Sequence, residues 1–480
     1  MVALAAIAFV TLAAEAATEA APAEGAAWAP SVAERIFKGE ERLNPDRHAS
    51  KLYGFIVKAD PTHPMYGRAQ LYLGQSLKKL GYTQAAAVWL SRVITERTDP
   101  EAVPEALATL LEIFEGPHDE ALETQVLGVL DVASLPTKIA ARVRFTQGLL
   151  DLKAGRDQWA KAQFNQLPNG SAEQALARHA VLVTRVKRGE SAPKLLPAFQ
   201  ALATDQSVPA PVKLEAQLAV ARLQYESKEF DSALSSYREV KLPLLDPGRP
   251  ALYLEEAWTK YRLGQHQAAM AVLVTLDAPS FDDAFLPDKY LLRAQIYMEK
   301  CHYLPARRAA RQLLRRFAGT LDAIEARAPL AEQAVLSKAA LAKGPAQKAQ
   351  ALWALVNGER DLLAKDGDDL GKALNDHLKA VYGTIYAEAT RIRDLKLERA
   401  LEGEANRLLD AAEQVRLVEY EVGLKLNARA SAHPDELVPE SQDAMGPEDV
   451  SYNFSGEYWN DELRDIRIDL EDRCQQGGKT

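Results

Sequence analysis

Apolar residues recur along this chain at steps of three and four, and a longer phrase repeats about every 36 residues. The clearest copies are residues 221–233 and 294–306. Each copy has a small residue, aromatic and aliphatic residues, a turn, an aromatic residue and an Ala inside a second apolar run. Self-similarity at this period predicts stacked pairs of antiparallel helices, not one globular core.

The small residue in the second helix of each pair sets the register of the repeat. It is found at Ala86, Ala160, Ala233, Ala269 and Ala306. Consecutive positions lie 74, 73, 36 and 37 residues apart, so a degenerate repeat is expected in each of the first two gaps. Residues 108–130, with Ala121 at this position, are one candidate, and residues 175–203, in which the position cannot be placed, are the other.

Three further positions of the repeat have a consistent chemistry. The first helix has Gly or Ala at Gly74, Gly148, Ala221, Ala257 and Ala294. The turn is occupied by Gly81, Gly155, Lys228, Gly264 and Cys301. A large apolar residue of the second helix falls at Leu90, Phe164, Tyr237 and Leu273, and Ala310 departs from this rule. Small residues permit close helix packing, and Gly can adopt the left-handed conformation that ends a helix.

This pattern resembles the tetratricopeptide repeat (TPR), a family with a unit of about 34 residues. The resemblance covers roughly residues 60–320. It implies an all-α solenoid, a right-handed superhelix of antiparallel helix pairs that binds a partner peptide or helix in a groove lined by the first helices. Residues expected to line this groove are Tyr72, Gln75, Gln217, Gln224, Glu256, Lys260, Tyr290, Arg293 and Tyr297.

The pattern divides the chain into four parts. Residues 1–30 are a predicted signal peptide and linker, and residues 31–320 hold about seven repeats. Residues 321–432 have two Pro and a longer helical pattern, which predicts a long-helix cap or a helical hairpin. A coiled coil that binds a partner is a second interpretation. Residues 433–480 form an acidic, aromatic tail.

The N-terminus favours export. An apolar run over residues 2–14 is followed by the small-x-small site Ala14-Glu15-Ala16, but no Lys or Arg precedes the run. A periplasmic or cell-envelope protein is expected. The alternative is a cytoplasmic TPR adaptor, in which these residues are an Ala-rich tail. No other run approaches the roughly 20 apolar residues that span a membrane.

Export and the TPR resemblance together imply an envelope scaffold. TPR proteins of this kind assist outer-membrane assembly, secretion, pili or gliding motility. The Cys301-His302-Tyr303 repeat and the aromatic tail resemble those of myxobacterial envelope or gliding-motility complexes. A structural envelope protein that contacts peptidoglycan or membrane machinery is an alternative function.

Charge is concentrated near the C-terminus. Residues 435–473 contain 13 acidic and three basic residues, a net charge of −10, so the rest of the chain carries about +1. This balance gives no support to nucleic-acid binding, which needs a basic face. Four aromatic residues of the tail are expected to dock on the solenoid or on a partner because they are costly to expose: Tyr452, Phe454, Tyr458 and Trp459.

One segment is strongly basic, with Arg307, Arg308, Arg311, Arg315 and Arg316. Their spacing places them on neighbouring sides of one helix. The cluster is interpreted as a solvated helix face or as a patch that binds carboxylates of a peptide. A linked hypothesis docks the acidic tail beside residues 307–316.

The remaining chemistry is sparse. Cys301 and Cys474 pair only if the tail folds back, and two separate thiols are the favoured interpretation. The sequence has no His-Glu-x-x-His and no Gly-x-Ser-x-Gly, and residues 367–373 depart from a phosphate-binding loop in spacing. A non-enzymatic protein-binding scaffold is therefore expected, with a protein partner, no cofactor and no metal. A missed enzyme site is the contrasting possibility.

Truncating an aromatic residue of the repeat tests the register. Tyr225→Ala or Tyr297→Ala removes a side chain whose burial contributes about 1.5–3 kcal/mol, and neighbouring repeats share that contact. We expect several repeats to loosen together, measured as a lower melting temperature with broadened unfolding. Wild-type melting in either variant would show that the register is misplaced.

Overall fold

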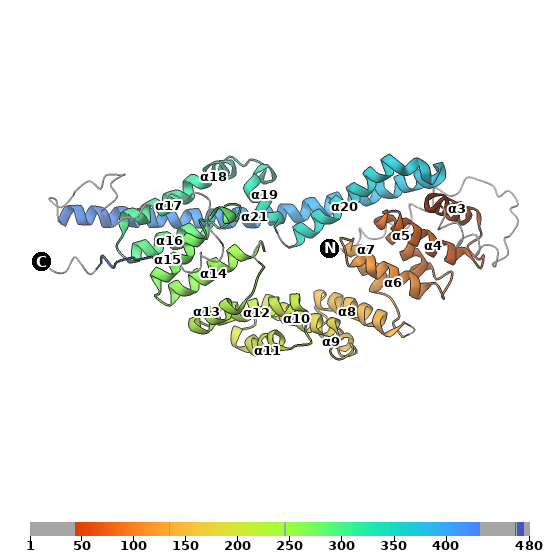
Figure 1. Ribbon diagram of the computed structural model, residues 1–480, viewed down its shortest axis with the longest axis horizontal. Helices are drawn as coiled ribbons and strands as arrows, with labels where there is room; N and C mark the ends of the chain where they lie inside the picture. Colours follow the sequence, from red (N-terminus) through yellow and green to blue (C-terminus); the bar gives the residue numbers. More distant parts are fainter. Residues whose placement is uncertain are drawn as a thin grey trace. The chain divides into compact units, whose positions relative to one another are not determined.

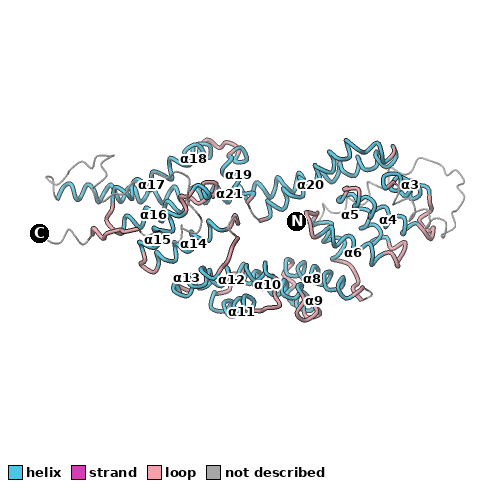
Figure 2. Tube along the Cα trace, viewed as in Figure 1, coloured by secondary structure: helices cyan, strands magenta, loops and turns pink. Residues whose placement is uncertain are grey.

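The structure, a computed structural model, describes residues 44–133, 135–243, 246–342, 344–432, 466 and 468–474. Throughout these residues the regular secondary structure is helical, without strands (Figures 1 and 2). Consecutive helices pack as pairs, and a long helix ends the helical part of the chain. The predicted all-α helical-repeat class with a long C-terminal helix is confirmed.

The helices form two compact units. Of the described residues, unit 1 contains those up to Pro168 together with Lys348–Leu395, and unit 2 contains Asn169–Gln347 and those from Lys396 onward. The long helix α21 (Lys372–Ala432) contributes its first part to unit 1 and its later part to unit 2. The repeat pattern did not indicate this division.

Unit 1 is built from the early helices and the first part of the C-terminal hairpin. Its α-helices besides α21 are α3 (Pro45–Lys58), α4 (Tyr66–Lys79), α5 (Thr83–Glu96), α6 (Val103–Phe114), α7 (Glu120–Leu127), α8 (Thr137–Lys153), α9 (Asp157–Phe164) and α20 (Pro345–Asp366). The short 3-10 helix η3 (Gly367–Leu370) joins α20 to α21.

Unit 2 contains the later helix pairs. Its α-helices besides α21 are α10 (Ala172–Lys187), α11 (Ala192–Thr204), α12 (Ala210–Glu226), α13 (Phe230–Glu239), α14 (Arg249–Arg262), α15 (His266–Thr275), α16 (Asp288–Glu299), α17 (Tyr303–Arg316), α18 (Ala318–Glu325) and α19 (Ala334–Leu341). The 3-10 helices are η1 (Pro279–Phe281) and η2 (Leu330–Glu332).

The turn inside a helix pair has a recurrent backbone geometry. A residue with φ between 58° and 89° occupies the turn at Gly81, Gly155, Lys228, Gly264 and Cys301. The next amide donates to a carbonyl five residues earlier, as from Tyr82 to Leu77 and from His302 to Tyr297, each at 2.8 Å. This bond satisfies a carbonyl that the helix end leaves without an amide partner.

The same geometry reveals the repeat that could not be placed from the sequence. Gly189 joins α10 to α11 with φ of 75°, and Glu190 N–H donates to Arg185 O at 3.2 Å. By spacing from the turn, the expected small residue is Lys194, which is exposed, and Leu195 and Phe199 fill the core instead. The small residue was therefore absent, although the helix pair was present.

The other degenerate repeat was placed wrongly. Ala121 lies in the first turn of α7 and is exposed, so it marks no close approach between helices. Among the described residues between α6 and α7, none has a left-handed backbone. The short α7 is capped by Asp119, whose carboxylate accepts the Ala121 amide at 2.8 Å.

Small residues occur where two helices of a pair approach closely. A methyl group built on Gly74 would lie 2.8 Å from Leu90, and one on Gly148 would meet the Phe164 ring. The small residues of the second helices are at most 1% exposed: Ala86, Ala160, Ala233, Ala269 and Ala306. The large apolar residue of one helix thus fits against the glycine of its partner.

The long helix covers an apolar face in each unit. In unit 2, Leu408, Val415 and Val422 of α21 pack against Ala306 and Leu313 of α17. Within unit 1, its Leu374, Leu378 and Tyr382 belong to the same core as the helices of the early pairs, α3 to α6. A stack of helix pairs leaves an apolar face at each end, and α21 covers part of that surface.

Helices α20 and α21 form an antiparallel hairpin in unit 1. Tyr382 Oη donates to Glu359 Oε2 at 2.6 Å, and farther along the hairpin Trp353 Nε1 donates to Thr390 Oγ1 at 3.1 Å. As residue numbers fall along α20, those of their partners rise along α21, so the two helices are antiparallel.

Glu359 connects this hairpin to the α4–α5 helix pair. The carboxylate is 3% exposed and accepts the backbone amides of Thr83 and Gln84 at 3.0 Å each. These amides begin α5 and have no acceptor within that helix. Burial raises the pKa of Glu359, and the hydrogen bonds from Tyr382, Gln84 and Thr83 oppose that rise. A residue 275 positions away thus caps α5.

Replacing this carboxylate by an amide tests its role. Glu359→Gln keeps the shape but points an NH2 group at a backbone N–H, so the free energy of unfolding should fall by about 2 kcal/mol. Tyr382→Phe removes one hydrogen bond and should cost about 1 kcal/mol. Urea unfolding followed by circular dichroism measures both. Equal stability of E359Q and wild type would contradict the capping role.

Candidate functional site

The basic cluster of α17 contacts the long helix of its own unit. Arg311 Nε donates to Glu419 of α21 at 2.7 Å, and Arg307 Nε donates to the same oxygen at 3.4 Å. Partial burial disfavours the Glu419 carboxylate, but the two arginine hydrogen bonds outweigh it and lower the pKa of Glu419. The carboxylate that this cluster binds therefore comes from the cap helix.

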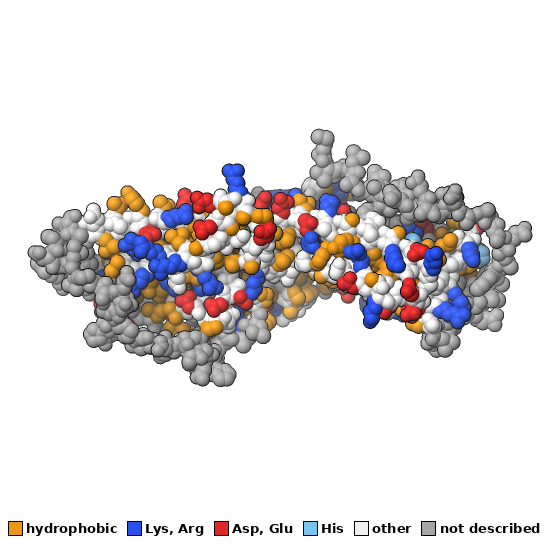
Figure 3. All heavy atoms as spheres, turned by 90° about the horizontal axis from the view of Figure 1, so that it is seen from above, with side chains coloured by type: hydrophobic (Ala, Val, Ile, Leu, Met, Phe, Trp, Pro, Cys, Tyr) orange, Lys and Arg blue, Asp and Glu red, His pale blue; other side chains and the backbone are white. Residues whose placement is uncertain are grey.

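The rest of the cluster faces outward. Arg308, Arg315 and Arg316 are exposed, and Arg316 donates to the Asp282 carbonyl at 2.9 Å. Figure 3 shows Lys and Arg side chains gathered over the part of unit 2 that contains α17, with acidic side chains close by. Local pairing accounts for part of this basic face.

Three residues expected to line a groove lie inside unit 2. Tyr290 and Arg293 of α16 are 6% and 8% exposed, and Gln224 of α12 is 7% exposed. Ser236 Oγ donates to Gln224 Oε1 at 2.6 Å. Their placement on a groove surface is corrected: the tight helix stacking buries these positions of the first helices. Lys260 of α14 is half-buried and pairs with Glu256 at 2.9 Å.

Arg293 takes part in an ion cluster with two buried cations and one partly exposed carboxylate. Its guanidinium donates to Asp277 Oδ2 at 2.6 Å and to Leu273 O at 2.9 Å. Lys289 Nζ donates to the other oxygen of Asp277 at 3.1 Å, and burial lowers the pKa of Lys289. One carboxylate after α15 thus holds two cations of α16, which orients these neighbouring helices.

The C-terminal segment docks on unit 2. Cys474 forms a disulfide with Cys301, at the left-handed turn between α16 and α17. The favoured interpretation of two separate thiols was therefore wrong. The sequence separation of 173 residues concealed the pairing, because only folding brings the tail back to the turn.

Polar contacts also fix this segment. Lys300 Nζ donates to Asp472 at 3.0 Å, and the Arg473 amide donates to the Lys300 carbonyl at 3.2 Å. His302 Nε2 lies 2.8 Å from the Glu471 carbonyl oxygen. The hydrogen bond from Lys300 is the main cause that lowers the pKa of Asp472.

Apolar contacts complete the docked segment. Leu470 is 8% exposed and belongs to the core formed by α14, α15 and α16, and Ile466 and Ile468 pack against that core. A hollow of about 470 Å³ adjoins Ile466 and is lined by residues of α13, α14 and α15, among them Lys260. The surface thus accepts an extended segment with apolar residues at every second position.

The described residues of the tail dock at the α16–α17 turn, which directly precedes the arginine cluster, whereas most acidic residues of the tail lie outside the described residues. Among the described residues of the tail, Asp469 accepts from Gln267 and Asp472 pairs with Lys300. The turn offers Lys300 together with a covalent partner, which explains why the segment lies there. The aromatic residues Tyr452, Phe454, Tyr458 and Trp459, and residues 1–30, lie outside the described residues.

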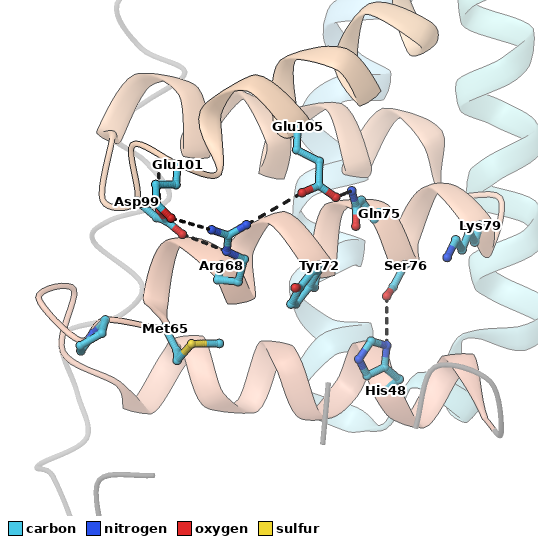
Figure 4. A pocket seen from close by; sticks show the side chains of 11 residues that line it. His48, Met65, Arg68, Tyr72, Gln75, Ser76, Lys79, Asp99, Glu101 and Glu105 are labelled. Carbon is cyan, nitrogen blue, oxygen red and sulfur yellow. Dashed lines mark hydrogen bonds and ion pairs between the residues drawn. The ribbon is translucent and has the colours of Figure 1, made fainter. Parts of the chain in front are cut away.

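A second hollow, of about 660 Å³, lies on unit 1 (Figure 4). Arg68 of α4 points between Asp99, at 3.0 Å, and Glu105, at 3.9 Å. Gln75 donates to the same Glu105 at 3.0 Å. These polar groups satisfy one another, and the lining carries both signs of charge, so nothing in it selects one class of ligand. The other residues labelled in Figure 4 are His48, Met65, Tyr72, Ser76, Lys79 and Glu101.

Within the described part of the chain, no group of three His, Cys, Asp or Glu side chains is arranged to hold a metal ion. Comparison with known proteins gives no further assignment: no protein-family model, curated protein or solved structure significantly matches this chain.

Sequence reasoning missed the contact residues of the tail. Gln267 lies in the first turn of α15 and donates to Asp469 at 3.1 Å, and Lys300 and His302 flank Cys301 at the α16–α17 turn. The one available signal was Cys301 at a turn position that usually holds a small residue, combined with Cys474 near the C-terminus.

Removing the shared carboxylate should destabilise unit 2. Asp277→Ala leaves Arg293 and Lys289 buried without that partner, and we expect the free energy of unfolding to fall by about 2 kcal/mol, below the full cost of a buried pair because Asp277 is partly exposed. Glu419→Ala, in a more open ion pair, is the matched control and should cost about 0.5–1 kcal/mol. Urea unfolding measures the stability of both variants, and equal losses would argue that Asp277 does not hold Arg293 and Lys289 as described.

Proposed function

We propose that this chain is a non-enzymatic, TPR-like scaffold that binds a partner protein in the bacterial cell envelope. The observation that carries the proposal is the segment of residues 468–474, which lies on the helix pairs of unit 2 through side-chain and backbone contacts. A surface that holds one extended segment has the features needed to hold another.

An exposed apolar row on α21 also favours protein binding. Leu417, Tyr420 and Leu424 follow one another at steps of three and four, and they are 58%, 66% and 52% exposed. They lie apart from Val415, Val418 and Val422, which pack inside unit 2. This long helix thus covers its own unit with one side and offers apolar side chains on another.

Two features favour the envelope over a cytoplasmic adaptor. The N-terminal apolar run resembles a secretory signal, and the Cys301–Cys474 disulfide suits an oxidising compartment such as the periplasm. Among the described helices, none has both the length and the apolar character to cross a membrane. A role in motility, secretion or outer-membrane assembly would fit a scaffold in this place, and the repeat and tail resemble myxobacterial components of that kind.

Fractionation with crosslinking tests the proposal. The full gene, with a C-terminal tag, is expressed in a Gram-negative host and crosslinked proteins are identified by mass spectrometry. We expect mature protein beginning near Ala17 in the periplasmic fraction, with envelope proteins attached. The matched control Ile7→Arg/Val10→Arg interrupts the apolar run and should keep the chain unprocessed in the cytoplasm. Wild-type protein that stays unprocessed with cytoplasmic partners would overturn the envelope assignment.

A further inference from the structure

We propose that the surface formed by α15 and the α16–α17 turn is a redox-gated binding site for an extended, acidic and apolar segment of a partner protein. The chain's own residues Ile466 and 468–474 occupy this site in cis while the Cys301–Cys474 disulfide holds them. This inference rests on the proposed scaffold function and names one of its sites and the chemistry of its partner.

The apolar part of the site selects an alternating pattern. Ile466, Ile468 and Leu470 stand at steps of two, so an extended backbone places their side chains on one face. All three contact the core of α14–α16, and Leu470 is the most deeply buried of them. A partner segment needs aliphatic residues at the same spacing to fill these positions.

The polar part of the site selects carboxylates. Gln267 donates to Asp469 at 3.1 Å, and Lys300 donates to Asp472 at 3.0 Å. The Lys300 carbonyl and the His302 ring contact the backbone of the bound segment. These contacts therefore do not depend on the side chains of that segment. The site therefore recognises a segment with alternating aliphatic residues and acidic residues between and after them.

The disulfide makes occupation by the tail conditional. Cys474 is exposed and Cys301 is partly exposed, so a small dithiol can approach the bond. A thiolate of the dithiol attacks Cys474 Sγ, the Cys301–Cys474 bond breaks, and Cys301 leaves as a thiolate that takes up a proton. The second thiol of the reductant then displaces Cys474 as a thiol, and the reductant becomes a disulfide. Two electrons and two protons pass to the protein.

Reduction changes the competition for the surface. The covalent link keeps the tail at a very high effective concentration beside the site, which excludes a free segment. Without the link, the tail is held by a few side-chain contacts and its chain connection, so a partner segment can displace it. A tail without the Leu470 contact should compete even less with the partner segment for this surface.

Peptide binding to the full-length chain tests the gate. The probe is a fluorescein-labelled synthetic peptide of residues 465–473, and its binding is measured by fluorescence anisotropy. Four forms are compared: oxidised wild type, wild type reduced with dithiothreitol, Cys474→Ser, and Leu470→Asp/Cys474→Ser. We expect affinity to rise in that order, with the reduced form and C474S equal and the last form binding at least tenfold more tightly than oxidised wild type.

Matched controls separate the site from general loosening. The chain has two cysteines, so dithiothreitol acts on this one bond and should leave C474S unchanged. Adding Lys300→Glu to L470D/C474S should weaken peptide binding at least tenfold, because it replaces the partner of Asp472 by a like charge. Circular dichroism and melting temperature confirm that each form is folded.

Two results would overturn the inference. A folded L470D/C474S chain that does not bind the peptide would show that the surface is not a segment-binding site. Equal binding by oxidised and reduced wild type would remove the gate. If either occurs while envelope proteins still crosslink to the full-length chain, the scaffold function stands and only this site is wrong.

Discussion

Covering the open apolar faces of stacked helix pairs is the constraint on which the rest of this structure depends. Each pair buries one side against its neighbour, and the terminal pairs lack that neighbour. Helix α21 supplies it in unit 2, where Leu408, Val415 and Val422 pack on α17. In unit 1 its first part joins the core of the early helices. The 61-residue length of this helix follows from serving two units with one element.

Polar groups then fix the relative positions of helices that hydrophobic contacts hold together. Glu359 places two oxygens on the first amides of α5, and Asp277 places its own on two cations of α16. Aliphatic contacts tolerate small displacements, whereas a carboxylate that accepts hydrogen bonds from two fixed donors does not. These two acids therefore set how neighbouring helices are oriented, although neither belongs to the repeated pattern.

The tail is also held by apolar contacts and aligned by polar groups, and a disulfide is added to both. Apolar residues of the segment fill positions on the α14–α16 core, while Lys300, His302 and Gln267 fix its alignment. The bond to Cys301 adds a restraint that depends on the compartment. The surface of α14–α16 and the segment that lies on it are therefore joined by a covalent bond in addition to apolar packing and hydrogen bonds.

The sequence by itself determined the helical class and most of the repeat register, because close helix packing demands Gly or Ala and the turns demand a left-handed residue at fixed spacing. It failed where another residue solved the same problem, as Leu195 and Phe199 do beside the exposed Lys194. Only the tertiary structure decided the two units, the Glu359 cap, the burial of Arg293 and the Cys301–Cys474 pair. These depend on contacts between residues far apart in the chain, and no local spacing encodes such contacts.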